Sequence, residues 1–318
     1  MLVDIKILAN MKKWHKSFVE ALLNNDLKSA QEIRDVNLPK KLYQYCSFSI
    51  RTLANLDKNR IWLSNPTNFN DPYDTALNLL YKTEQTAIKH WESLSEKIGI
   101  QDFISRDDFV KIYLLPRFQF YPELAKRLSK KGIGRHYVTI KSFIELSKTL
   151  SDNDSQSASA VAQNSFFVGC MTENYKSILM WSHYANHHRG LCLEYDVSNS
   201  FPDIMRRNLY PVIYSDKLFD GSHLFTINGV NNSEMLAASL HKSHEWSYER
   251  EWRIALSNPS ELNGQFMDDV SPSEILIGAK MSRDDIDLVT GIATSKRIGM
   301  SLMYMDHNKF GLSRIRIA

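Results

Sequence analysis

Short hydrophobic runs bounded by polar residues recur along much of the chain, and such runs predict β-strands. Near the start, they occur in "KLYQYCSF", "RIWLS" and, at residues 75–81, "TALNLLY". The second half continues with "FFVGCM", "GLCLEYD", "LYPVIYSD", "EWSYEREWRIAL", "EILIGAK", "SLMYMD" and "SRIRIA", and the clearest two-residue alternation is in "WSYEREWRIAL". Short strands are therefore expected to form most of the core.

Hydrophobic residues spaced three to five apart predict helices elsewhere. The opening segment, about residues 8–35, is amphipathic and is expected to be helical. Residues 83–150 carry helical patterns such as "TAIKHWESLSEKI" and "FIELSKTL", and the Ser- and Asn-rich segment 151–160 follows. We therefore expect a helical insertion at about 83–160 that ends in a flexible connection. Further helices are expected at "IRTLANLDKN", "SILMWSHYA", 232–243 and 282–297.

Helices and strands do not alternate regularly in this order, and no internal repeat is present. That arrangement is typical of an α+β fold, so we expect a mixed, largely antiparallel sheet core with flanking helices and a helical insertion. The first strands must pair with strands far along the chain. We therefore expect a single domain over residues 1–318.

Composition adds limits on the class of protein. The 318 residues are 43% hydrophobic and 24% charged, which is ordinary for a globular protein. A net charge of +3 argues against a broad basic face for nucleic acid. Three scattered cysteines without a CxxC motif favour a reducing compartment. No signal peptide and no membrane span are evident, so a cytoplasmic protein without a membrane partner is expected.

The segment "WSYEREWRIAL" holds the first candidate site. On a strand, Glu249, Glu251 and Arg253 would share one face, with the two carboxylates about 7 Å apart. Close carboxylates in a cleft can take separate pKa values, which suits acid–base catalysis. The alternative is a solvated sheet face on which Arg253 bridges two glutamates.

The second candidate site is "SILMWSHYANHHRG". On a helix, His183 and His187 would be four residues apart, a spacing that can hold a metal. The catalytic Glu of an HExxH motif is absent and no third ligand is evident, although Asp71 or His244 could serve; we therefore expect no metal. Trp181 and Tyr184 would share a helix face, as core residues or as a stacking platform.

The third candidate is the loop "NPTNFNDPYD", which follows the strand "RIWLS". It brings Asn70, Asp71 and Asp74 together within five residues. Such residues favour turns for purely local reasons, but they could equally form the rim of a cleft. We expect the three segments to meet around one polar hollow.

Other common motifs are missing. No GxGxxG, P-loop or GxSxG occurs. Cys46, Cys170 and Cys192 each lie in an apolar strand context with no neighbouring base, so we expect all three to be core residues rather than nucleophiles.

The blocks "LYQYCSF…TLANLDKNRIWLSNPTNFNDPYD", "SILMWSHYANHHRGLCLEYD", "VIYSD", "WSYEREWR" and "EILIGAK" resemble a bacterial family, domain of unknown function 2971, over residues 42 to about 305. The resemblance implies a role in defence against phage. It shows one departure, because Cys46 stands where the family usually has an Arg. If that Arg acts chemically, the resemblance implies an impaired member, or one in which Arg51 or Arg60 substitutes.

The order of these blocks is also similar, more loosely, to ADP-ribosyltransferases. That similarity implies NAD as cofactor, Glu251 as the essential carboxylate, Glu249 as its helper and Arg253 as a phosphate or carboxylate clamp. It further implies a group of cofactor-binding residues: Tyr45, Asn70, Asp71, Asp74, Trp181, His183 and Tyr184.

Three functions follow as hypotheses. The first is an NAD-dependent ADP-ribosyltransferase-like or NAD-consuming effector that acts on an unknown protein or nucleic-acid target. The second is a non-catalytic sensor or protein-interaction module, motivated by Cys46. The third is a metal-assisted hydrolase or nuclease that uses His183, His187, Asp71 and Asp74.

Overall fold

The computed structural model describes residues 13–75, 77–78, 84–115, 117–129, 159–220, 225–226, 229–230, 232–258 and 263–317. The described residues within 1–76, 160–219 and 228–318 form one compact unit, and those within 77–159 and 220–227 form a second. The predicted segments 143–150 and 151–158 lie outside the described residues. The expectation of a single domain stays a prediction.

The first unit is built on a sheet that contains ten strands among the described residues. Eight of them follow the order β13-β2-β4-β1-β5-β14-β15-β16. Strand β12 pairs with β4, and β6 pairs with β12. Its strand pairs are antiparallel, except that β14 runs parallel to β15. The strands are β1 (Lys41–Cys46), β2 (Ile61–Ser64), β4 (Phe166–Thr172), β5 (Leu191–Asp196), β6 (Leu209–Pro211), β12 (Glu251–Ser257), β13 (Gly264–Met267), β14 (Glu274–Ile277), β15 (Gly299–Met305) and β16 (Leu312–Arg316). The predicted α+β class is confirmed.

Pairing between distant strands sets which side chains share a face of this sheet. Strand β12 pairs with β4 along its full length, in the register Glu251↔Thr172 and Trp252↔Met171. Because successive side chains of a strand point to opposite faces, Trp252 joins the main hydrophobic core, and Glu251 faces the other way. The polar positions of β12 are thereby gathered on one side.

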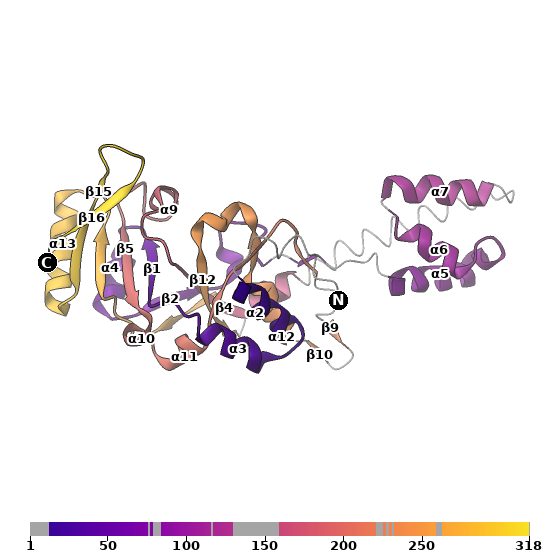
Figure 1. Ribbon diagram of the computed structural model, residues 1–318, viewed down its shortest axis with the longest axis horizontal. Helices are drawn as coiled ribbons and strands as arrows, with labels where there is room; N and C mark the ends of the chain where they lie inside the picture. Colours follow the sequence, from indigo (N-terminus) through magenta and orange to yellow (C-terminus); the bar gives the residue numbers. More distant parts are fainter. Residues whose placement is uncertain are drawn as a thin grey trace. The chain divides into compact units, whose positions relative to one another are not determined.

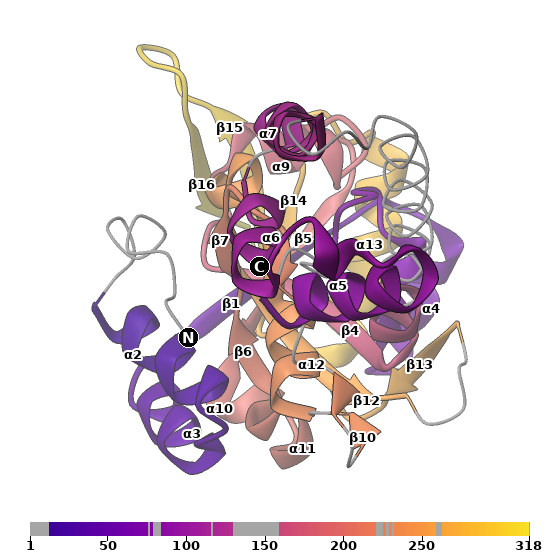
Figure 2. The same cartoon turned by 90° about the vertical axis from the view of Figure 1, so that its right-hand side faces the viewer.

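Helices surround this sheet (Figure 1). Helix α13 packs against α4 and β15. Helices α2 and α3 lie side by side (Figure 2), and α12 contacts α2. The helices of this unit are α2 (Lys13–Leu23), α3 (Leu27–Asp35), α4 (Ile50–Asp57), α9 (Ile178–His183), α10 (Val197–Ser200), α11 (Asp203–Arg207), α12 (Asn232–Leu240) and α13 (Arg283–Lys296), with short helices η1 (Pro66–Asn68) and η3 (His244–Glu249).

Shorter strands complete the description. Strand β7 (Ile213–Ser215) pairs in parallel with β11 (His241–Ser243). The others are β3 (Leu77–Asn78), β8 (Phe219–Asp220), β9 (Phe225–Thr226) and β10 (Gly229–Val230). Of the strand predicted at 75–81, only Leu77–Asn78 is described as strand.

The N-terminal helices expected at 8–35 are, from residue 13 on, α2 and α3, which are separated because Asn25 takes a left-handed φ of 61° and Asp26 caps α3 through Ser29. A later predicted element differs from the structure. The strand expected through 246–256 begins only at Glu251. Residues 244–249 form η3 instead, and Arg250 follows it with a φ of 47°. That left-handed residue breaks the extended backbone, so Glu249 and Glu251 do not share one strand.

Among the described residues, the second unit contains the helices α5 (Glu84–Ile98), η2 (Ile100–Asp102), α6 (Arg106–Tyr113) and α7 (Arg117–Ser129), together with the short strands β3 and β9. Helix α6 contacts both α5 and α7. The unit has its own hydrophobic core, which includes Leu94, Phe109 and Leu124. Across both units, none of the described helices has the length and apolar character needed to traverse a lipid bilayer.

Candidate functional site

A cavity of about 150 Å³ opens on the face of the sheet opposite the main core. Its apolar and aromatic lining residues are Tyr43, Tyr45, Phe69, Met171, Met180 and Tyr184. Its polar lining residues are Asn70, Asp74, Cys170, Thr172, Lys242, Glu249 and Glu251. Residues from all three candidate segments thus line a single hollow.

The floor of the cavity follows from strand register. Because Thr172 pairs with both Glu251 and Tyr43, strands β12, β4 and β1 present these side chains on the same face. Tyr45, two residues beyond Tyr43, lies on that face too, and its hydroxyl donates to the Asn174 carbonyl at 2.8 Å. Three strands distant in sequence therefore supply the base of the site.

Arg253 is completely buried and is held by carboxylates on two sides. Its Nη1 and Nη2 donate to Asp74 at 2.8 and 2.6 Å, and its Nε donates to Glu251 at 2.9 Å. Nη1 also donates to the Ser239 carbonyl at 2.6 Å, and Nη2 to Glu251 at 3.3 Å. A guanidinium has five N–H groups, so Arg253 has none left for a ligand.

Asp74 is the residue of the 69–74 loop that joins this network. Its carboxylate accepts from Arg253, and its carbonyl accepts from Gln163 Nε2 at 3.0 Å. The loop is therefore a wall of the hollow, fixed by an ion pair. Asp71 is also buried, but it does not line the cavity; its Oδ1 accepts from the Tyr73 N–H, and its Oδ2 has no hydrogen-bond partner among the described residues.

Lys242 connects the two glutamates that the sequence had placed on one strand. Its Nζ donates to Glu249 at 2.6 Å and to Glu251 at 2.8 Å. Strand β11 brings it there through parallel pairing with β7. Lys242 could not be identified as a site residue from the sequence, because a single Lys between His241 and Ser243 carries no periodic signal.

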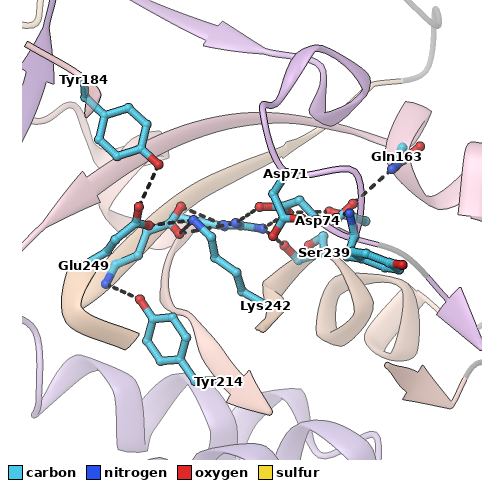
Figure 3. Close-up of polar contacts among 12 residues, drawn as sticks. Asp71, Asp74, Gln163, Tyr184, Tyr214, Ser239, Lys242 and Glu249 are labelled. Atoms are coloured by element: carbon cyan, nitrogen blue, oxygen red, sulfur yellow. Dashed lines mark hydrogen bonds and ion pairs between the residues drawn. The ribbon is translucent and has the colours of Figure 1, made fainter. Parts of the chain in front are cut away.

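Glu249 sits at the last position of η3, and its backbone carbonyl accepts a hydrogen bond from the Thr172 hydroxyl. Its carboxylate accepts from Tyr184 at 2.7 Å and from Lys242 (Figure 3). Burial raises the pKa of Glu249, aided by the negative charge of Glu251 and opposed by Lys242. Of the two glutamates, Glu249 is therefore the one better able to gain and lose a proton.

Glu251 behaves in the opposite way. Burial alone would raise its pKa, but Arg253 and Lys242 outweigh that effect and lower the pKa to about 2. Glu251 also accepts from three N–H groups of these two residues. Its carboxylate stays ionised and serves to hold both cations in place.

The network carries a net negative charge when all its groups are ionised. Three carboxylates (Asp74, Glu249, Glu251) face two cations (Lys242, Arg253), which gives −3 + 2 = −1. A hollow with this charge favours a cationic ligand, a hydrogen-bond donor or a positive charge that develops during a reaction.

The remaining residues from the helix "SILMWSHYA" divide between site and core. Tyr184 reaches the cavity, whereas Trp181 is fully buried, donates to the Tyr175 carbonyl and packs edge-on against Tyr45. His183 makes a ring contact with Tyr184 but does not line the cavity. Of the residues expected to bind a cofactor, Tyr45, Asn70, Asp74 and Tyr184 line the hollow, and Asp71, Trp181 and His183 do not.

The helical pairing of His183 with His187 is wrong. Helix α9 ends at His183, and Asn186, His187 and His188 all take left-handed φ values between 45° and 68°. Gly190 then passes so close to β1 that an added Cβ would lie 2.3 Å from the Cys46 carbonyl. Among the described residues, no cluster of three or more His, Cys, Asp or Glu side chains could hold a metal ion.

The three cysteines occupy three different environments. Cys192 is buried and Cys46 is half-buried, in line with the core prediction. Cys170 instead is exposed within the cavity, so the core prediction is wrong for this residue. Desolvation and the negative charge of Glu251 raise the pKa of the Cys170 thiol well above the usual value. The thiol therefore stays protonated and is a poor nucleophile.

The fold and the site together define an α+β protein with a buried chain of alternating charges beside a small hollow. A family model described as "Protein of unknown function (DUF2971)" matches residues 180–254. The matched segment runs from α9 to β12 and includes Tyr184, Lys242, Glu249, Glu251 and Arg253. Neither the curated proteins nor the solved structures contain a match.

Proposed function

We propose that the hollow is the active site of an ADP-ribosyltransferase-like or NAD-consuming enzyme, in which Glu249 acts on the substrate. The observation that carries this proposal is the position of Glu249. Its carboxylate is buried, lines the cavity, has a raised pKa and is held by Tyr184 and Lys242. Acid–base groups are tuned in this way to work near neutral pH.

The chemistry suits the charge of the site. When the bond between nicotinamide and ribose breaks, its electron pair leaves with nicotinamide and positive charge develops on the ribose carbon. The net charge of −1 around Glu249 favours that change. Glu249 then takes the proton of the attacking water or target nucleophile. Tyr184 and Lys242 hold its carboxylate in place.

The size of the hollow limits which part of NAD it can hold. Sites for drug-sized ligands usually measure about 300–1,000 Å³, and this one measures about 150 Å³. We therefore place only the nicotinamide end inside it. Tyr43, Phe69 and Tyr184 supply aromatic surface for that ring.

The proposal changes the roles expected for two residues. Glu251 and Arg253 bond to each other and to Lys242 and Asp74. They are positioning residues, and Glu249 is the proposed catalytic residue.

Turnover of NAD by the purified chain tests the proposal. Glu249→Gln keeps the shape of the side chain but cannot exchange a proton, and we expect kcat/KM to fall by about a hundredfold or more. The matched control is Glu245→Gln, an exposed acid on the same short helix, which should keep full activity. Melting temperatures report folding of both variants. Absence of both NAD turnover and an NAD-induced melting shift in the wild type would refute the proposal.

A second candidate function, a non-catalytic sensor or interaction module, is favoured by one observation. Every N–H group of Arg253 is bonded within the protein, which is typical of a structural network. We propose phage defence as the setting of either function, on the family resemblance alone. Plating of phage on bacteria that express the chain distinguishes the enzyme from the non-catalytic module. If the chain is an enzyme, Glu249→Gln should abolish protection of the bacteria; if it is a module, the variant should still protect them.

A further inference from the structure

A second cavity, of about 200 Å³, lies on the opposite face of strand β1. Tyr43 and Tyr45 point to the candidate active site, whereas Gln44 and Cys46 line this second cavity. The other walls come from α4, β2, β5 and residues 270–272. The two cavities share no lining residue.

Arg60 is the one charged residue among those lining the second cavity. Its guanidinium lies 3.7 Å from the centre of the Phe266 ring, and its Nε donates to Asn55 Oδ1 at 3.2 Å. These two contacts fix the plane of the guanidinium. Within the described part of the chain, its terminal nitrogens have no hydrogen-bond partner and no carboxylate within ion-pair distance. A preformed, unpaired fork of N–H groups thus belongs to the cavity wall.

Tyr195 adds a hydrogen-bond donor to the lining of the same cavity. This residue is only 1% exposed, it lines the cavity, and its ring packs against Phe201. Its hydroxyl has no hydrogen-bond partner among the described residues. Burial raises the pKa of Tyr195, so the hydroxyl remains protonated and can donate. The hydroxyl oxygen is not among the fully buried polar atoms left without a partner in the described residues, so it is accessible and can bond to water or to a ligand.

The rest of the lining is largely apolar. Leu56, Ile61, Leu193 and Val270 contribute aliphatic surface, and Trp62 adds an aromatic ring. Such walls accept a flat apolar body and disfavour a group with several charges. A planar fork with one positive charge matches a carboxylate, which accepts two parallel N–H bonds.

We propose that this cavity binds a small aromatic carboxylic acid, with its carboxylate on Arg60 and its ring against the apolar wall. The volume is below the usual range for drug-sized ligands, which limits the ligand to about one ring with small substituents. Tyr195 donates a hydrogen bond to the bound molecule. The site is separate from the proposed NAD site.

Calorimetric titration of the full chain with benzoate and 4-hydroxybenzoate tests the assignment. We expect both to bind, and we expect Arg60→Gln to weaken binding about tenfold or more, as for the loss of a charge-assisted pair. The control is Arg51→Gln, because Arg51 is also a cation over Trp62, at 5.8 Å, but does not line the cavity. This control should bind as the wild type does.

Benzamide provides a test that needs no variant. It has nearly the shape of benzoate but no negative charge, so the wild type should bind it about tenfold or more weakly. Binding of benzamide as tight as that of benzoate, or no binding of either acid by the wild type, would overturn the proposal. Glu249→Gln should leave benzoate binding unchanged, which separates this result from the fate of the proposed NAD site.

Discussion

Arg253 joins three segments that lie far apart in the sequence: the 69–74 loop through Asp74, helix α12 through the Ser239 carbonyl, and its own strand through Glu251. A lysine could not replace these contacts, because an ammonium has three donors and no planar fork. Arg253→Lys should therefore lower the free energy of unfolding by about 3 kcal/mol or more. Urea unfolding measures this, with the exposed Arg250→Lys as control. Equal loss in both variants would contradict the role of Arg253.

Glu251 predicts a dependence of stability on pH. Its pKa in the folded protein is about 2, below the usual 4.5, so the unfolded chain binds its proton first as pH falls. The stabilisation is full above about pH 4.5 and is lost progressively towards pH 2, with a size on the order of 3 kcal/mol. Glu249 has the opposite sign, because its raised pKa removes stability as pH rises above 4.5.

Glu251→Gln isolates this contribution. The variant should be several kcal/mol less stable than the wild type near pH 6, because it leaves two buried cations with one carboxylate fewer. The difference in unfolding free energy between the wild type and the variant should narrow as pH falls below 4.5. Urea unfolding at pH 6 and at pH 3 measures this difference. An equal difference at both pH values would contradict the lowered pKa of Glu251.

Two elements meet at Arg250, which joins η3 to β12 in a left-handed conformation with a φ of 47°. Non-glycine residues cost about 1–2 kcal/mol in this region, and β-branched residues cost more. We therefore expect Arg250→Gly to be neutral or to stabilise the fold by up to about 1 kcal/mol, and Arg250→Val to destabilise it. Urea unfolding of the pair decides this. If Arg250→Val were more stable than Arg250→Gly, residue 250 would not need the left-handed conformation.

Strands that coincide with short apolar runs could be predicted from the sequence, and turns set by single backbone angles could not. Strands β1, β2, β4, β5 and β14 lie where such runs predicted them. The apparent alternation in "WSYER" is not a strand, because Arg250 turns the chain. Likewise, three left-handed residues after α9 separate His183 from His187. Tertiary contacts fix such angles, and no periodicity reveals them.

The candidate site was predicted in outline for a similar reason. Asn70, Asp74, Tyr184, Glu249 and Glu251 are polar groups in otherwise apolar or turn contexts, and each stands out in the sequence; all five line the hollow. Lys242 does not stand out, and only the pairing of β11 with β7 places it between the glutamates. The division of labour between Glu249 and Glu251 depends on Lys242, so it could not be predicted either.

At the scale of the whole molecule, each unit has a hydrophobic core of its own. Two cores predict two unfolding transitions. Phe109→Ala, in the second unit, should lower the free energy of unfolding of that unit by about 3–5 kcal/mol. Leu42→Ala, in the first unit, should lower the free energy of unfolding of the first unit by about 2–5 kcal/mol. Both side chains are fully buried. Scanning calorimetry measures the transitions, and a single transition shifted by both variants would contradict the prediction.

The bond between Arg253 and Asp74 has a consequence for how a molecule could reach the hollow. Swinging the 69–74 loop outward would strip a fully buried guanidinium of its main counter-charge, at a cost of several kcal/mol. The ion pair therefore keeps the 69–74 loop in place as a wall of the cavity. A ligand therefore has to fit a cavity whose wall is already in place, and selection by rigid fit replaces closure of the loop around the ligand.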